Sequence, residues 1–211
     1  MKTIYFVRHA ESEGNAGTHY QEGVTPLSVL GKAQAQALAD RTKKLPVEVI
    51  VSSTMVRAME TTKAIAMSLD VPIEYSDIFI ERRRPSEQIN QLKTSNEVIE
   101  AEDAIIQNSG ISGYRYSDEE NFDDLKVRAK LALDYLEAHP TQNILVVTHG
   151  VFLRVLLTFG IFGGEVTERE YKGILSGFTS SNTGVTVMKY DESRTDHPWT
   201  LLTWNDYAHL G

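Results

Sequence analysis

Short apolar runs alternate along the chain with stretches in which apolar residues recur every three or four positions. The runs are apolar on both faces, as in residues 3–7 (TIYFV), which is typical of strands that helices cover on both sides. The predicted strands are residues 3–7, 47–51, a short extended piece at 73–80, 143–147, and a final pair at 185–190 and 199–204. The predicted helices are residues 28–44, a helix capped by Ser53 or Thr54 that ends at Leu69, about 119–137, and 151–159.

Residues 82–120 interrupt this alternation, because they are polar and acidic with Gly110 and Gly113 in their middle. We interpret them as a mostly helical excursion beside the sheet. The rest predicts an α/β fold, a three-layer α/β/α sandwich with a mainly parallel central sheet, as a single domain over residues 1–211. Since such folds bind ligands at the carboxyl ends of their strands, the residues after each strand are the candidates for chemistry.

Composition and charge narrow the classes of function. The 211 residues include no cysteine, which excludes disulfides, thiolate chemistry and cysteine zinc sites. The formal net charge of −8 argues against nucleic-acid binding, which needs a basic surface. No apolar run approaches the roughly 18 residues of a membrane span, and the N-terminal run is too short for a signal peptide. We expect a cytoplasmic protein that binds neither nucleic acid nor membrane.

Four predicted strand ends carry cationic or reactive side chains. They are Arg8 and His9 after the first strand, Arg57 in the helix after the second, Glu81 before the run 82–84 (RRR), and His149 after residues 143–147. Two arginines suit the oxygens of a tetrahedral anion, and a neutral imidazole can attack phosphorus. A second histidine can stabilise developing charge, and a carboxylic acid can protonate the leaving oxygen.

These side chains are the parts needed for phosphoryl transfer without a metal. Glu11 and Glu13 beside His9 offer an alternative, a metal site, but the flanking arginines disfavour a bound cation. We therefore predict no metal ligands.

Several motifs also resemble the histidine phosphatase superfamily, which is also called phosphoglycerate mutase-like. They are VRHAESEGN, SSTMVRAMETT, VVTHGVFLRVLL, and the closing stretches SSNTGVTVMKY and TLLTWNDYAHL. The family opens with Arg-His-Gly-Glu-x-x-x-Asn, so Ala10 replaces its usual glycine here. The resemblance spans nearly the whole chain and weakens between about residues 82 and 118.

The resemblance implies a role for each candidate residue. His9 would be phosphorylated, and Arg8, Arg57 and His149 would bind the transferring phosphoryl group, with a supporting polar role for Asn15. Glu81 matches the proton donor of the family, and no cofactor or metal is implied. The run Arg82-Arg83-Arg84-Pro-Ser-Glu departs from the common continuation, which leaves Glu87 as an alternative acid. The three arginines either contact a second anionic group on the substrate or balance acidic helices.

The favoured function is hydrolysis of a small phosphomonoester through a phosphohistidine intermediate. A mutase is one alternative, although mutases usually carry Gly-Trp-x-Asp where this chain reads AGTHYQEGVTPLS. A non-catalytic module that binds a phosphorylated ligand is another, although such a module would be expected to lose its nucleophile or arginines. We expect specificity to come from residues 82–120 and 16–25, where Tyr20, Tyr114 and Tyr116 either line the mouth of the site or pack the excursion.

Overall fold

Six strands form one mixed sheet in the computed structural model, which describes residues 1–20 and 23–211. In chain order they are β1 (Lys2–Arg8), β2 (Val49–Ser52), β3 (Ile73–Tyr75), β4 (Asn143–Thr148), β5 (Val185–Tyr190) and β6 (Trp199–Asp206). Their order across the sheet is β3-β2-β4-β1-β5-β6. The first four of these are mutually parallel, whereas β5 and β6 are antiparallel to their neighbours. The predicted α/β class with a mainly parallel sheet is thus confirmed.

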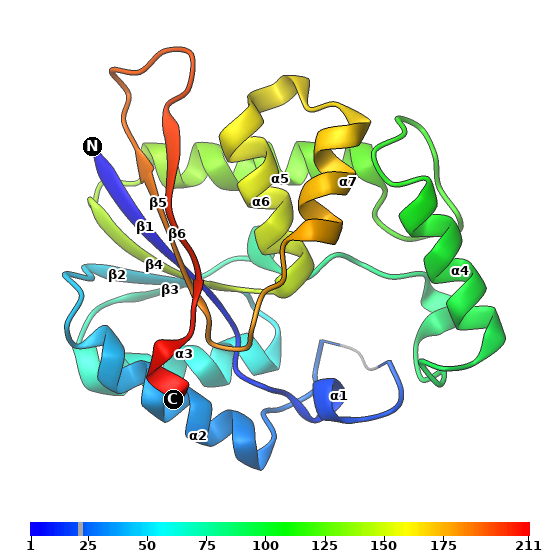
Figure 1. Ribbon diagram of the computed structural model, residues 1–211. Helices are drawn as coiled ribbons and strands as arrows, with labels where there is room; N and C mark the ends of the chain where they lie inside the picture. The colour runs from blue at the N-terminus through cyan, green and yellow to red at the C-terminus, as the bar shows by residue number, and fades with distance from the viewer. Residues whose placement is uncertain (21–22) are drawn as a thin grey trace.

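Helices cover both faces of this sheet. The α-helices of the described residues are α1 (Glu13–Ala16), α2 (Val29–Thr42), α3 (Val56–Leu69), α4 (Asn96–Gln107), α5 (Phe122–Ala138), α6 (Gly150–Phe162) and α7 (Glu168–Gly177). Figure 1 shows α5, α6 and α7 on one side of the sheet and α2 and α3 on the other. Each side has its own apolar core, with Phe6 and Phe152 in one and Val7 and Ile65 in the other. Alternate residues of β1 thus serve both cores, which is why residues 4–7 of this strand are all hydrophobic.

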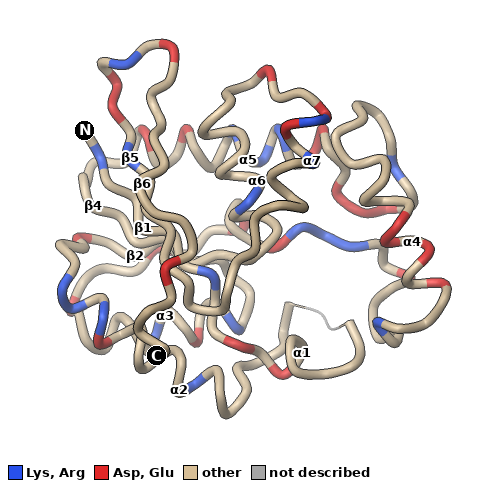
Figure 2. The backbone as a smooth tube through the Cα atoms, in the orientation of Figure 1, with Lys and Arg blue, Asp and Glu red and all other residues tan. Residues whose placement is uncertain are grey.

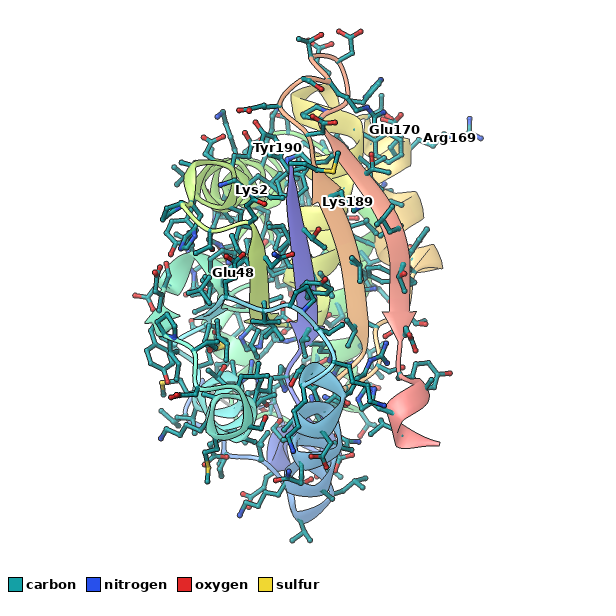
Figure 3. All side chains as sticks on the ribbon, turned by 90° about the vertical axis from the view of Figure 1, so that its left-hand side faces the viewer. Lys2, Glu48, Arg169, Glu170, Lys189 and Tyr190 are labelled. Atoms are coloured by element: carbon teal, nitrogen blue, oxygen red, sulfur yellow. The ribbon has the colours of Figure 1, made fainter. Side chains whose placement is uncertain are left out.

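The strand register positions the chemistry. Arg8 at the end of β1 pairs with Thr148 at the end of β4, so the following residues, His9 and His149, leave the sheet side by side. At the opposite end of β1, Lys2 pairs with Tyr190 of β5, and both are labelled at the far end of the sheet in Figure 3.

Some local predictions differ from the structure. Neither Ser53 nor Thr54 caps α3, because the helix begins after Met55, with no side-chain cap. The extended piece ends at Tyr75 and continues as a 3₁₀ turn, Asp77–Phe79. The sequence pattern does not predict α1 or α7. The excursion holds α4 and one 3₁₀ turn, Ser86–Gln88, joined by irregular segments, and Figure 1 shows α4 standing away from the sheet.

Candidate active site

A cleft of about 140 Å³ opens at the carboxyl ends of β1 and β2. Its lining includes five of the six residues singled out from the sequence: Arg8, His9, Asn15, Arg57 and Glu81. The sixth, His149, is fully buried with its ring centroid 4.9 Å from that of His9. The remaining lining residues are Ser12, Gly14, Tyr20, Thr25, Arg84 and Lys93.

The hydrogen bonds of His9 fix its tautomer. Its Nδ1 lies 2.7 Å from the carbonyl oxygen of Ala10, which can only accept, so Nδ1 carries the proton. The lone pair then sits on Nε2, which accepts a 3.2 Å hydrogen bond from Nε of Arg57. Burial, reinforced by His149, Arg57 and Arg8, lowers the pKa of His9 well below its ordinary value. The imidazole is therefore neutral and nucleophilic near pH 7.

The hydrogen bonds of His149 involve the opposite ring nitrogen, because its Nε2 and not its Nδ1 has a partner in the described part of the protein. Its Nε2 lies 2.8 Å from the hydroxyl of the buried Ser53, which itself accepts a hydrogen bond from the backbone N–H of Met55. In the tautomer in which Ser53 donates its proton to Nε2, Nδ1 of His149 carries the hydrogen and is an N–H donor. That Nδ1 is buried without a partner among the described residues. Burial, together with Arg57 and Arg8, lowers the pKa of His149 well below its ordinary value.

Arg8 is held beside both histidines. One of its terminal nitrogens donates to the carbonyl oxygen of Ser180, whereas its Nε is buried and has no partner among the described residues. The first residue of α6, Gly150, permits this approach, because a Cβ there would lie 3.3 Å from Nε of Arg8 and 3.0 Å from Oγ of Ser180. Burial lowers the pKa of Arg8, but guanidinium groups stay protonated in proteins.

Glu81 sits against the N-terminus of α6. Its carboxylate accepts from the backbone N–H groups of Arg82, Val151 and Phe152 at 2.9, 3.1 and 2.9 Å. Burial pushes the pKa of Glu81 upward, but these three donors and the charge of Arg57 outweigh it, so the pKa is lowered overall. The carboxyl group is thus ionised near pH 7.

The alternative acid, Glu87, lies elsewhere. It is exposed, accepts a hydrogen bond from the Ser117 hydroxyl at 2.8 Å, and is absent from the cleft lining. The structure therefore brings Glu81, and not Glu87, to His9.

Asn15 borders the cleft through local structure. Its side-chain oxygen accepts from the N–H of Ser12, and its own N–H donates to the Ser12 hydroxyl, so the pair forms a capping box on α1. Sequence reasoning missed several polar neighbours. Asn182 donates to the carbonyl oxygen of His9 at 2.9 Å, and Thr61 accepts from the N–H of Ala10 at 3.0 Å. Both positions fall inside the family-like stretches, but no local pattern marks them.

The remaining candidates separate into those at the cleft and those away from it. Glu11 accepts from the Ser28 hydroxyl at 2.7 Å. In residues 1–20 and 23–211, no cluster of three or more histidine or acidic side chains is arranged to hold a metal. Tyr20 lines the cleft, Tyr114 lies in a separate small pocket of the excursion, and Tyr116 is exposed. Residues 21 and 22 of the predicted specificity segment 16–25 lie outside the described residues.

The sequence profile of the histidine phosphatase superfamily (branch 1) matches residues 4–207. The chain belongs to this superfamily. This membership makes it a phosphatase-type enzyme and confirms the family predicted from the motifs. No helix in the described part of the chain has the length and apolarity needed to cross a membrane.

Proteins that resemble this chain are named either as mutases or as phosphatases. The probable phosphoglycerate mutase GpmB of Citrobacter koseri is 27% identical over 213 residues, which cover 100% of this chain and 95% of the relative. A putative alpha-ribazole-5'-P phosphatase from Escherichia coli superposes with a TM-score of 0.78 at 19% identity, covering 98% and 97% of the two chains. A mycobacterial glucosyl-3-phosphoglycerate phosphatase superposes with a TM-score of 0.77 at 19% sequence identity, and the match covers 97% of this chain and 99% of that one. These two likenesses concern the fold.

Proposed function

We propose that the protein hydrolyses a small phosphomonoester in the cytoplasm, without metal or cofactor, through a phosphohistidine on His9. One observation carries this proposal. Two buried donors, Nε of Arg8 and Nδ1 of His149, have no partner in the described structure and lie beside a neutral His9. Leaving buried donors unpaired costs free energy, about 1–3 kcal/mol each. A phosphoryl group in the cleft would accept hydrogen bonds from both donors. Its negative charge would also offset the positive charge of the neighbouring arginines.

In the proposed first step, Nε2 of His9 attacks phosphorus while the bond from phosphorus to the leaving oxygen breaks. Arg57 transfers its hydrogen bond from Nε2 of His9 to a phosphoryl oxygen, which frees the lone pair. Arg8 and His149 donate to the other phosphoryl oxygens as charge builds on them. Glu81 donates a proton to the leaving oxygen, so an alcohol departs.

In the second step, the Glu81 carboxylate accepts a proton from a water molecule that attacks the phosphohistidine. The bond between phosphorus and Nε2 breaks, which releases inorganic phosphate and restores both His9 and Glu81. Glu81 must be protonated before the first step, although its three N–H donors and the charge of Arg57 lower its pKa. A bound phosphate dianion supplies the reason, because negative charge nearby raises the pKa of a carboxyl group.

The test is hydrolysis of an aryl phosphate in the presence of EDTA by the native protein and by His9→Ala. We expect activity that survives EDTA and is lost in His9→Ala, and native protein quenched in alkaline detergent, in which phosphohistidine is stable, should retain label from a radiolabelled phosphate ester on His9. His139→Ala is the matched control, because His139 is also buried but contacts Glu74 and Thr141 away from the cleft. Activity that EDTA abolishes, or that His9→Ala retains, would contradict the mechanism.

The role of Glu81 is tested with two leaving groups. Glu81→Gln should slow hydrolysis of an alkyl phosphate by about 10²–10⁴-fold, because an alkoxide needs its proton as it departs. The first step should suffer far less with an aryl phosphate, since a phenolate leaves unaided, and it is followed as the burst of alcohol or phenol released before water attacks the phosphohistidine. Glu87→Gln should match the native protein on both substrates. Equal losses of this burst rate on both substrates for Glu81→Gln would assign Glu81 to binding and not to proton donation.

A mutase is the second candidate, favoured by relatives named as probable phosphoglycerate mutases over the whole chain. A mutase would return the phosphoryl group from His9 to another hydroxyl of the same substrate instead of to water. Incubation of phosphorylated protein with glycerate phosphates distinguishes the two. Release of inorganic phosphate supports the phosphatase, whereas label recovered in the glycerate phosphates supports the mutase.

A further inference from the structure

The cleft extends beyond the phosphoryl-binding side chains to a second group of residues, Tyr20, Arg84 and Lys93. The guanidinium carbon of Arg84 lies 3.9 Å from the centroid of the Tyr20 ring, and Nζ of Lys93 lies 5.8 Å from it. Backbone hydrogen bonds join the two segments, since Tyr20 N–H donates to Gln91 and Asn90 N–H donates to Tyr20. The aromatic ring thus holds two cationic side chains at the cleft.

These cations are not fully neutralised by the protein. Arg84 forms an ion pair with Glu102, but the same carboxylate lies 3.6 Å from Arg82, so two guanidinium groups share one negative charge. Lys93 donates to the carbonyl oxygens of Gly14 and Gly17 at 2.7 and 2.6 Å, which carry no net charge. Burial and the neighbouring Arg84 lower the pKa of Lys93, as expected where positive charge is crowded.

The charge of the whole cleft lining points the same way. It contains four cationic side chains, Arg8, Arg57, Arg84 and Lys93, against the single carboxylate of Glu81. The protein as a whole is acidic, with a formal net charge of −8. Figure 2 shows the contrast, with a blue segment running from the sheet towards an acidic α4. A phosphate dianion balances only part of this local excess, which leaves positive charge at the Tyr20 end.

We propose that Tyr20, Arg84 and Lys93 form a subsite for a second anionic group on the substrate, either a carboxylate or a second phosphate. This inference rests on the proposed function, because it takes the phosphoryl group to lie at His9. The substrate class would be a phosphomonoester that carries another negative charge. Arg84 offers forked donors to this group, and Lys93 offers a point charge.

The proposal predicts a substrate preference. Alkyl phosphates that end in a methyl group are compared with equally long ones that end in a carboxylate or a second phosphate, with one to four methylene groups between the ends. At one length, the native protein should hydrolyse an anionic compound with a kcat/KM at least about tenfold above that of its methyl counterpart, because only the anionic end accepts charge-assisted hydrogen bonds from Arg84 and Lys93. The carboxylate and phosphate arms identify which anion is preferred.

A matched pair of variants assigns the preference to Arg84. Arg84→Gln and Arg82→Gln each remove one cation that faces Glu102, but only Arg84 lines the cleft. Arg84→Gln should lower kcat/KM for the preferred anionic compound by about 10- to 100-fold and leave the methyl series within about twofold. Arg82→Gln should keep the native preference. A substitution of Lys93 would not test the subsite alone, because the hydrogen bonds of Lys93 to Gly14 and Gly17 also hold the segment that contains Asn15.

Binding provides a readout that does not need turnover. Alkyl phosphonates with and without a terminal carboxylate are titrated calorimetrically into the native protein and both variants, and only the carboxylates should bind more weakly to Arg84→Gln. Equal affinity of the native protein for both series would overturn the subsite. Equal losses on both series in Arg84→Gln would also overturn it. A preference in binding without any hydrolysis would uphold the subsite and reject the proposed phosphatase.

Discussion

Ser53 illustrates how a residue outside the reacting set can determine the chemistry of one inside it. Its side chain is fully buried at the end of β2 and lies within hydrogen-bonding distance of Nε2 of His149. The Met55 N–H occupies one of the two acceptor positions of the Ser53 hydroxyl, and the proposed mechanism has its single hydrogen donated to Nε2 of His149. In that mechanism the proton on Nδ1 of His149, which the phosphoryl group needs as a donor, depends on Ser53.

Ser53→Ala should therefore lower kcat by about 10- to 100-fold, in keeping with the loss of a donor to the developing charge. Nitrogen-15 NMR of His149 should show a shift from the Nδ1–H tautomer to a mixture. Ser52→Ala is the control, because Ser52 is equally buried and bonds to Thr62 and the Ser53 carbonyl without touching a histidine. It should reduce stability by about 1–3 kcal/mol and leave kcat near native. An unchanged His149 tautomer in Ser53→Ala would refute the assignment.

Helix α2 shows the same dependence for an element. Gly31 in its first turn packs on the segment that follows His9, so closely that a Cβ at this position would lie 1.8 Å from the Glu11 carbonyl oxygen. The Glu11 carbonyl oxygen belongs to the backbone, so it cannot move aside for a new Cβ as the end of a flexible side chain could. Any side chain at position 31 must therefore displace residues 10–12, which carry the carbonyl that orients His9.

Gly31→Ala should destabilise the protein and reduce activity, even though alanine favours helices over glycine by about 1 kcal/mol. Gly173→Ala is the matched substitution, because Gly173 lies within α7 and a Cβ added there would meet nothing within 4 Å. It should stabilise the protein by up to about 1 kcal/mol and leave activity unchanged. Denaturant unfolding and aryl phosphate hydrolysis of the two variants check both effects. A Gly31→Ala protein with native activity would show that residues 10–12 can move without harm.

Elements also mark how far the sequence can be interpreted. Apolar runs in the sequence predict the buried strands. The parallel register of β1 and β4 then brings His9 and His149 together, so this part of the site is predictable. The local pattern predicts a helix cap at Ser53, whereas the contact of Ser53 with His149 spans 96 positions of chain and leaves no local signal. Lys93 and Tyr20 meet only through the irregular pairing of two loops, for which no periodic signal exists.

At the scale of the whole molecule, the site places a cost on stability. His9 and His149 are buried as neutral groups among arginines, and burial lowers the pKa of each well below its ordinary value of 6.5. Below about pH 6.5 the unfolded chain therefore binds protons that the folded protein does not. The free energy of unfolding must then decrease as the pH falls from about 6.5 towards the lowered values, since protons favour the state that binds more of them.

Each such histidine contributes up to about 1.4 kcal/mol per pH unit, so the pair contributes up to about 2.7. The double variant His9→Asn, His149→Asn should lose this part of the slope between about pH 5 and 6.5, as measured by urea unfolding at several pH values. Glu81 acts in a separate window, because its lowered pKa takes effect below about pH 4.5. A double variant with the native slope would mean that the pKa values of the two histidines are not lowered in the folded protein. Stability and catalysis thus depend on the same two uncharged rings, but stability should begin to fall at a higher pH than His9 loses its nucleophilicity, because the unfolded chain takes up protons at a higher pH than the folded His9 does.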